Sequence, residues 1–432
     1  ISKLFYERFI KNEDITLFSP HDTPGLYDAF GMPEFDELYL KYEKDKSVPK
    51  FTINAQELFM DLLKERAETG RIYIMNIDHC NTHSSFKDKV NMSNLCQEIT
   101  LPTTPIQHID DKEGEIALCI LSAVNLGLLT DIDELEELCD LSVRALDEII
   151  DYQEYPVEAA KVSTLARRSL GIGFIGLAHY LAKNQVSYES KAAAKLVDKV
   201  SEAFQFYLLK ASNNLAKEKS KCLWFEKTKY SDGILPIDTY KKELDDIVSR
   251  KYTYDWEWLR KEIKEHGLRH STLSAQMPSE SSSVVSNATN GVEPPRDYLS
   301  IKKSKKGPLK QIVPDYNRLK NFYTLLWDMK SNEGYINIIS VMQKYFDQAI
   351  SGNWSYNPEN YKDGEVPLSV MAQDLLNTYK LGWKTAYYQN TYDAKTEIEE
   401  PVHPIGWHDG VEEKEENKEV LNDEENCEAC TI

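Results

Sequence analysis

The pattern of apolar and polar positions predicts several long helices. Leucine and methionine recur at helical spacing across residues 54–69, and Gly70 follows, where a helix commonly ends. The stretches 131–152, 190–219 and 256–266 also predict helices. For the helix over 131–152 we expect an inner face formed by Leu135, Leu138, Val143, Leu146 and Ile149.

Short apolar runs between these stretches predict strands. Residues 72–74 are one candidate, and a second begins at Leu268. The run Gly114–Leu121 is almost continuously apolar, which is typical of a parallel strand buried on both faces. An amphipathic helix is expected over Leu4–Ile10, with Ser2 as a candidate N-cap. Alternation of strands and helices indicates an α/β fold.

Composition narrows the class of protein. The 432 residues suffice for roughly two to three domains, and 41% hydrophobic with 28% charged residues is typical of globular proteins. A net charge of −20 argues against a nucleic-acid partner. Seven scattered cysteines fit a reducing compartment, and we find neither a membrane span nor a signal peptide. We therefore expect a cytoplasmic protein.

The stretch Met92–Ile99 holds the strongest candidate for chemistry. If it is extended, Asn94, Cys96 and Glu98 point to the same side. An amide, a thiol and a carboxylate suit a polar ligand better than a core, because a buried carboxylate is costly unless paired. Glu98 would then act as base, Asn94 would orient the ligand and Cys96 would react. A free cysteine on a polar edge strand is the alternative.

Two other patterns have less specific interpretations. Cys80 lies between His79 and His83, but ligands so close in sequence seldom complete a zinc site, and we predict no metal. The run Gly171–Gly176 matches a dinucleotide-binding pattern, so a dehydrogenase is one hypothesis. The preceding Ala166–Leu170 is not a buried strand, so close backbone packing is the favoured interpretation.

The later part of the chain adds three candidate segments. In Met277–Val285, proline and clustered hydroxyls predict a helix N-terminus that binds phosphate, or simply a serine-capped helix. Adjacent Tyr387 and Tyr388 could serve packing or function. Beyond these residues an acidic stretch predicts a disordered arm. It ends with Cys427 and Cys430, which could exchange a disulfide with a distant site or form half of a zinc site.

Together these segments resemble the large, catalytic alpha subunit of class I ribonucleotide reductase of the aerobic bacterial and phage type. The resemblance extends from Leu17 to the last residue. Its most specific motifs are Ser93–Glu98, Met277–Glu280, Ala288–Pro295, Tyr387–Asn390 and the terminal cysteine pair. It implies a ten-stranded α/β barrel with a central finger loop, followed by a small α+β domain and a disordered acidic tail.

The resemblance also implies roles for these residues. Cys96 would become a thiyl radical that removes the 3′ hydrogen of a ribonucleoside diphosphate. Glu98 would take the 3′-hydroxyl proton, Asn94 would hold the substrate hydroxyls, and Cys119 would be one of two thiols that reduce C2′. The residues expected to cradle the diphosphate are Ser279, Glu280, Ser281 and Ser282.

The resemblance also implies residues for radical transfer and for reduction of the active-site disulfide. Tyr387 and Tyr388 would carry an electron and a proton between Cys96 and a radical-generating beta subunit. Cys427 and Cys430 would reduce the active-site disulfide and then be reduced by thioredoxin or glutaredoxin. The chain would bind no cofactor of its own, and would depend on the di-metal tyrosyl-radical cofactor of the beta subunit.

Large subunits of this family are nearly twice as long as this chain. We therefore expect the C-terminal part of such a subunit, acting with a complementary N-terminal polypeptide that supplies the other reducing cysteine. The predicted divisions are a barrel portion, a small α+β domain and a redox tail, at residues 1–233, 234–392 and 393–432. A non-catalytic docking fragment is the alternative, but it would not need Cys96, Glu98, Cys119 and both tyrosines together.

Overall fold

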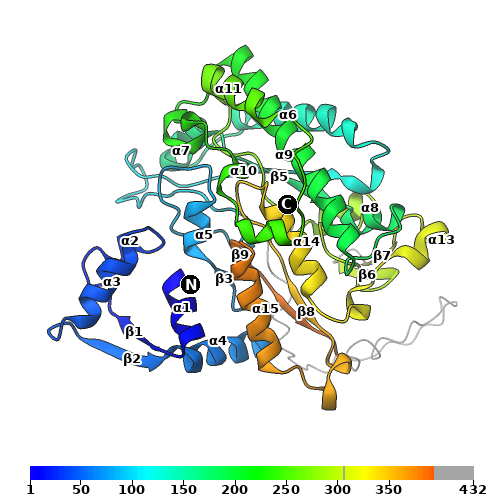
Figure 1. Cartoon of the computed structure of the whole chain (residues 1–432). Helices are drawn as coiled ribbons and strands as arrows, with labels where there is room; N and C mark the ends of the chain where they lie inside the picture. Colours follow the sequence, from blue (N-terminus) through cyan, green and yellow to red (C-terminus); the bar gives the residue numbers. More distant parts are fainter. Residues whose placement is uncertain (305–306, 394–432) are drawn as a thin grey trace, which may run out of the picture.

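A computed structural model describes residues 1–304 and 307–393 (Figure 1). The helices are α1 (Lys3–Lys11), α2 (Leu26–Ala29), α3 (Phe35–Lys44), α4 (Ala55–Thr69), α5 (Ile77–Thr82), α6 (Leu135–Tyr152), α7 (Glu158–Arg167), α8 (Leu177–Lys183), α9 (Lys191–Lys219), α10 (Pro236–Thr239), α11 (Trp256–His266), α12 (Glu280–Val285), α13 (Tyr316–Leu319), α14 (Glu333–Gln343) and α15 (Leu368–Lys380). The strands are β1 (Asp14–Phe18), β2 (Lys50–Asn54), β3 (Ile74–Met75), β4 (Ile120–Asn125), β5 (Leu170–Ile175), β6 (Leu299–Ser304), β7 (Gly307–Ile312), β8 (Trp354–Tyr356), β9 (Thr385–Ala386) and β10 (Gln389–Thr391).

The first helices and the β1–β2 hairpin form a unit at one side of the molecule, drawn in blue in Figure 1. Helix α1 is confirmed, but the Ser2 side chain does not cap it. Helix α4 is confirmed at both ends. The Asn54 side chain accepts hydrogen bonds from two backbone N–H groups of its first turn, and Gly70 ends it in the left-handed conformation.

Helices α6, α9 and α11 confirm the three other long predicted helices. Helix α9 is buried along most of its length and lies beside α6 (Figure 1). The predicted inner face of α6 is correct for Leu135, Val143 and Leu146 but wrong for Ile149, which is 43% exposed. Ile150 is buried instead, because 3.6 residues per turn bring it, and not Ile149, onto the face of Leu146 and Val143.

A parallel array of extended segments crosses the middle of the molecule. Strand β4 pairs with β5 in parallel, as predicted for the apolar run, but it begins at Ile120 rather than Gly114. The predicted burial on both faces is wrong, because Val124 is the one buried residue of the strand. Residues 272–276 lie next to β5 in the array, with Ser274 opposite Ile172. Residues 348–351 lie on the far side of residues 272–276, with Ile350 opposite Gln276. Within the described residues the array stays open and does not close into a barrel. The predicted division into domains stays a prediction.

The glycines in β5 permit this close packing, which confirms the packing interpretation of the Gly171–Gly176 run. A Cβ atom on Gly173 would lie 2.6 Å from the carbonyl oxygen of Ala275. A Cβ atom on Gly171 would lie 2.6 Å from the end of the Leu121 side chain and 2.9 Å from the Cys119 sulfur. The run is itself a buried strand, although its three glycines are unfavourable for one.

Gly173→Ala is therefore expected to destabilise the fold more than Gly171→Ala. The first variant forces a methyl group against a main-chain carbonyl, whereas the Leu121 side chain can move away from the second. Overpacking of this kind costs about 1–3 kcal/mol, and we expect Gly173→Ala to be at the upper end. Denaturant unfolding of both variants measures the difference. Equal stabilities would contradict the packing described here.

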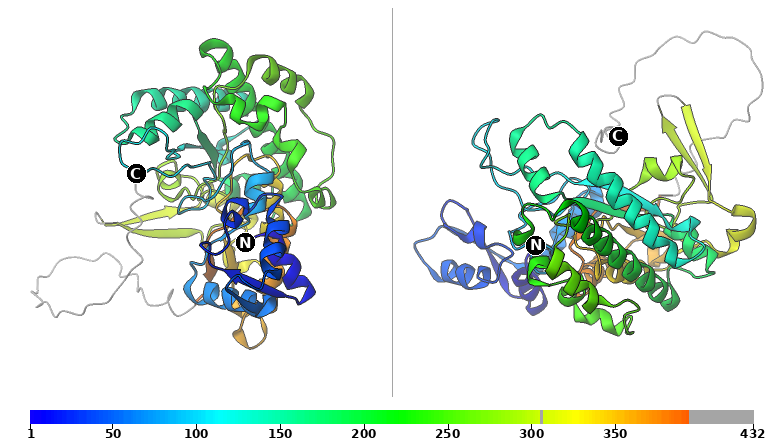
Figure 2. Two further views of the ribbon diagram at one scale, coloured as in Figure 1. Left: turned by 90° about the vertical axis from the view of Figure 1, so that its left-hand side faces the viewer. Right: turned by 90° about the horizontal axis from the view of Figure 1, so that it is seen from above.

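Two small strand pairs connect the end of the described chain to the array. Strand β9 pairs antiparallel with β3, and β10 pairs in parallel with β8. They bring the tyrosines at 387 and 388 back to the centre, while the β6–β7 hairpin projects from the body (Figure 2). None of the helices in the described residues is long and apolar enough to cross a membrane.

Candidate active site

The stretch around Cys96 forms a tight turn, so the predicted extended conformation is wrong. The N–H of Gln97 donates to the carbonyl of Asn94 at 3.1 Å, and Gln97 has a positive φ of 70°. The Asn94 side chain accepts a hydrogen bond from the Ile99 N–H at 3.0 Å. Asparagine favours such local bonds to the backbone, which compete with an extended strand.

The turn nevertheless gathers the three predicted side chains. Cys96 is 8% exposed and Glu98 is 2% exposed. The Ser351 hydroxyl donates to the Cys96 carbonyl and contacts a carboxylate oxygen of Glu98 at 3.2 Å. Burial raises the pKa of Glu98, and hydrogen bonds from Asn94 and Ser351 partly oppose the shift. The turn thus places a buried carboxylate and a buried thiol two residues apart.

Tyr387 contacts this thiol directly. Its hydroxyl donates to the Cys96 sulfur at 3.5 Å, and its ring lies 4.1 Å from the ring of Tyr388 and 4.7 Å from that of Tyr73. Burial, with hydrogen bonds to Tyr388 and Cys96, raises the pKa of Tyr387. The phenol therefore stays protonated, so removing an electron from it requires removing its proton as well.

Cys119 lies just before β4 and joins the site through Gln348. The amide of Gln348 donates to the Cys119 sulfur at 3.5 Å and to the carbonyl of Leu170 at 2.9 Å. Burial raises the pKa of Cys119 to about 12, and Glu98 is close enough to add to that shift. Cys119 is therefore a neutral thiol at ordinary pH.

The predicted phosphate-binding residues lie at the start of α12, which has only six residues. Ser279 is buried, and its backbone N–H donates to the Asn290 side chain at 3.2 Å rather than remaining open. Glu280, Ser281 and Ser282 are exposed. The chain leading into α12 lies against the site, because the Ser351 N–H donates to the Gln276 carbonyl at 2.9 Å. Their binding of phosphate stays a prediction.

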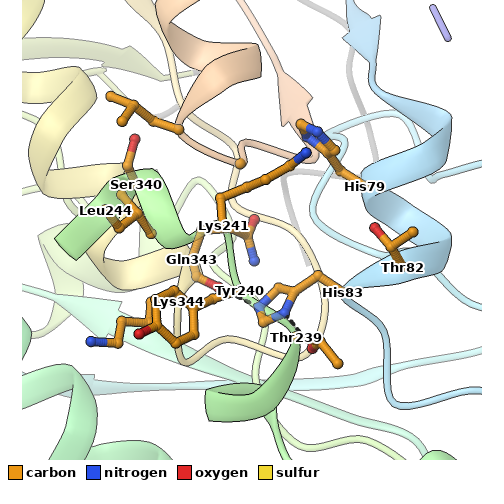
Figure 3. Close-up of a pocket in the computed structure, with 12 residues that line it drawn as sticks. His79, Thr82, His83, Thr239, Tyr240, Lys241, Leu244, Ser340, Gln343 and Lys344 are labelled. Atoms are coloured by element: carbon orange, nitrogen blue, oxygen red, sulfur yellow. Dashed lines mark hydrogen bonds between the residues drawn. The ribbon is translucent and has the colours of Figure 1, made fainter. Parts of the chain in front are cut away.

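The histidines beside Cys80 line a small polar pocket with room for about one water molecule (Figure 3). Both ring nitrogens of His83 are hydrogen-bonded, to the Thr239 hydroxyl at 2.8 Å and to the Gln343 carbonyl at 2.7 Å. His79 contacts the Trp383 carbonyl at 2.8 Å. In the described part of the chain, no three histidine, cysteine or acidic residues are placed to hold a metal ion.

Three residues that contact the site, Ser351, Gln348 and Tyr73, are not marked by any sequence motif. Ser351 and Gln348 follow α14, far along the chain from the two cysteines that they touch. Only pairing of distant segments brings them there, so no local pattern marks them. Tyr73 lies in the predicted strand 72–74, where its aromatic ring in a short apolar run is the one sequence signal of a further role. Cys427 and Cys430 lie outside the described residues.

The chain combines an open α/β array with a buried thiol turn beside two adjacent tyrosines. Residues 1–389 match the family described as "Ribonucleotide reductase, barrel domain". The chain belongs to this family, and the resemblance to its class I large subunits is confirmed.

Several named proteins are similar to the chain. The "Ribonucleoside-diphosphate reductase subunit alpha" of Haemophilus influenzae is 58% identical over 407 residues, which cover 93% of this chain and 54% of that protein. Subunit alpha of reductase 1 from Escherichia coli is 56% identical, with 95% and 55% covered. The phage T4 subunit is 43% identical, with 93% and 54% covered. The chain thus spans about half the length of these relatives.

Proposed function

We propose that this chain carries the reaction centre of a ribonucleoside-diphosphate reductase and forms 2′-deoxyribonucleoside diphosphates. The observation that supports this most strongly is the contact of the Tyr387 hydroxyl with the Cys96 sulfur, beside Glu98. A buried thiol that touches a buried phenol, with a base next to it, suits removal of a hydrogen atom from a polar substrate. The names of the similar proteins agree with this chemistry.

The reaction is proposed to begin when the Cys96 sulfur, as a thiyl radical, removes the hydrogen from C3′ of the ribose. Asn94 holds the ribose hydroxyls, and Glu98 accepts the proton of the 3′-hydroxyl as water leaves from C2′. The cofactor of a beta subunit supplies the oxidising equivalent. Tyr387 and Tyr388 are proposed to deliver it to Cys96, which is supported by the contact of the Tyr387 hydroxyl with the sulfur and by the adjacent Tyr388 ring.

Two thiols supply two electrons and two protons in total and become a disulfide. One proton leaves with the C2′ hydroxyl as water, the other adds as hydrogen to C2′, and Glu98 returns its proton to the 3′ oxygen. Cys119 is proposed as one of the two thiols, because it is a neutral thiol next to the residues that hold Cys96. Cys427 and Cys430 would reduce the disulfide by thiol exchange and pass the electrons on from thioredoxin or glutaredoxin. Cys96 finally returns a hydrogen to C3′.

The open edge of the array supports a complementary N-terminal partner. Within the described residues β4 pairs only with β5, and the nearby Leu118 and Leu121 side chains are 37% and 42% exposed. A free strand edge with apolar neighbours favours pairing with another chain segment. We propose that the N-terminal portion of the subunit covers this edge and supplies the second thiol. A ribonucleoside diphosphate and a beta subunit complete the proposed partners, in the cytoplasm.

Reconstitution tests this proposal. The chain alone is expected to be inactive and prone to associate. The N-terminal polypeptide is added in increasing amounts while the beta subunit, substrate and dithiol are held constant. The rate of deoxyribonucleotide formation should rise until the two polypeptides are equimolar and then level off. Product is measured by chromatography. A stable complex that lacks activity would instead favour the docking fragment, and activity with the beta subunit alone would contradict the need for a second thiol from the missing part.

The raised pKa of Glu98 predicts the pH dependence of the reaction. Glu98 must be ionised to accept a proton, so kcat/KM is expected to rise with pH through a pKa above the ordinary glutamate value. Ser351→Ala removes a hydrogen bond that lowers this pKa, so the rise should move to higher pH. Ser212→Ala, a buried serine bonded to His270, is the matched control and should not move it. An unshifted profile in the Ser351 variant would exclude Glu98 as the titrating base.

A further inference from the structure

Lys384 is a lysine enclosed in the core, with an exposed fraction of 1%. Its ammonium group donates to three successive main-chain carbonyls, those of Phe346 at 3.3 Å, Asp347 at 2.8 Å and Gln348 at 2.9 Å. All three of its donors are therefore used. Burial lowers the pKa of Lys384 to about 7, because the charged form loses its contact with water.

The segment that Lys384 binds leads directly into the site. After Gln348, which contacts Cys119, the N–H of Ala349 donates to the Glu98 carbonyl at 2.9 Å. Ser351 then binds the Cys96 carbonyl. Residues 346–351 thus hold the thiol turn from one side, and any shift of this segment moves Cys96 and Cys119 together.

The segment that carries Lys384 leads to Tyr387. Thr385 donates its hydroxyl to the Ile350 carbonyl at 3.2 Å, and the Tyr387 N–H donates to the Gly352 carbonyl at 2.8 Å. With the ammonium bonds of Lys384, these contacts run in the same order along both segments. They set the register in which the Tyr387 hydroxyl meets the Cys96 sulfur.

We infer that Lys384 is a positioning residue, which holds residues 346–348 in register with residues 384–387 and so sets the approach of the Tyr387 oxygen to the Cys96 sulfur. The inference rests on the proposed function. Lys384 does not touch the reacting atoms. It acts through the two segments that present them. Removing its ammonium group takes away the donor to the Asp347 carbonyl and leaves the carbonyls of Phe346 and Gln348 with the Gln343 amide alone.

The test uses Lys384→Met, which keeps most of the side-chain length but removes the three donors. In the chain itself, hydrogen exchange measured by mass spectrometry should be at least about tenfold faster at the amides of Ala349 and Tyr387. In the enzyme assembled with the N-terminal part and the beta subunit, kcat should fall roughly a hundredfold while KM for the nucleotide stays close to that of the unaltered enzyme.

Lys183→Met is the matched control. Lys183 also donates to two main-chain carbonyls, of Gly127 and Leu129 at 3.0 and 2.7 Å, but it holds no residue of the site. It should leave kcat and the exchange of the Tyr387 amide unchanged. Lys384→Gln keeps an amide donor and should recover part of both effects. If the methionine variant does not fold, the glutamine variant decides by the same two measurements.

Three results would overturn the inference. They are an unchanged kcat in a folded Lys384 variant, a loss that appears only in KM, and faster exchange spread evenly over the chain. Failure of the proposed function is distinguishable, because the unaltered assembled protein would then form no deoxyribonucleotide at all. In that case the exchange at Ala349 and Tyr387 still decides whether Lys384 holds the two segments together.

Discussion

Cys96→Ser is expected to lower deoxyribonucleotide formation by about a thousandfold or more in the assembled enzyme. Serine keeps the size and the ability to accept the Tyr387 hydrogen bond, but its O–H bond is too strong for an oxygen radical to form and return hydrogen in the same way. Nucleotide binding should survive, because Asn94 and Glu98 remain. Product formation and equilibrium binding are measured on the same preparation.

The control for this variant is Cys139→Ser. Cys139 is buried in α6, where its sulfur contacts the Phe204 carbonyl at 3.8 Å, and no residue of the site touches it. This variant should keep full turnover. Turnover of the Cys96 variant near that of the unaltered enzyme would contradict the assignment of the reacting atom.

Tyr387→Phe is expected to stop turnover almost as completely. Phenylalanine preserves the ring contacts with Tyr388 and Tyr73 but removes the hydroxyl that lies 3.5 Å from the Cys96 sulfur. A phenylalanine side chain has no hydroxyl group that can release a proton together with an electron. The oxidising equivalent would therefore not reach the thiol. Tyr388→Phe should have the same effect, while binding of the beta subunit is retained.

A tyrosine outside the site provides the comparison. Tyr39 is buried in the N-terminal unit, and its hydroxyl donates to the Thr16 carbonyl at 2.8 Å. Tyr39→Phe should cost stability only, with kcat unchanged. Normal turnover of either the Tyr387 or the Tyr388 variant, with the beta subunit bound, would place the radical route elsewhere in the protein.

Local patterns predicted most of the helical framework. Apolar periodicity is strong in α6 and α11, and capping and glycine signals mark the ends of α4. Strand β5 is not predicted by its sequence because glycine has a low propensity for strands. Here its small size is what lets neighbouring segments approach. The outcome at β5 depends on tertiary packing, which no local window contains.

The candidate site was predicted in its residues but not in its shape. Asn94, Cys96 and Glu98 were grouped by an alternation that the turn does not have, and they meet because Asn94 bonds to the backbone around them. Contacts from Ser351 and Gln348 depend on segments more than 200 residues away, so the sequence could not indicate them. Family resemblance supplied the roles that spacing alone left open.

A structure of the assembled enzyme with a bound ribonucleoside diphosphate tests the central claim most directly. The account predicts C3′ of the ribose in van der Waals contact with the Cys96 sulfur, the 3′-hydroxyl next to Glu98, and the diphosphate at residues 279–282. A nucleotide bound elsewhere, with the space beside Cys96 and Glu98 filled by protein, would contradict the claim that this chain holds the reaction centre.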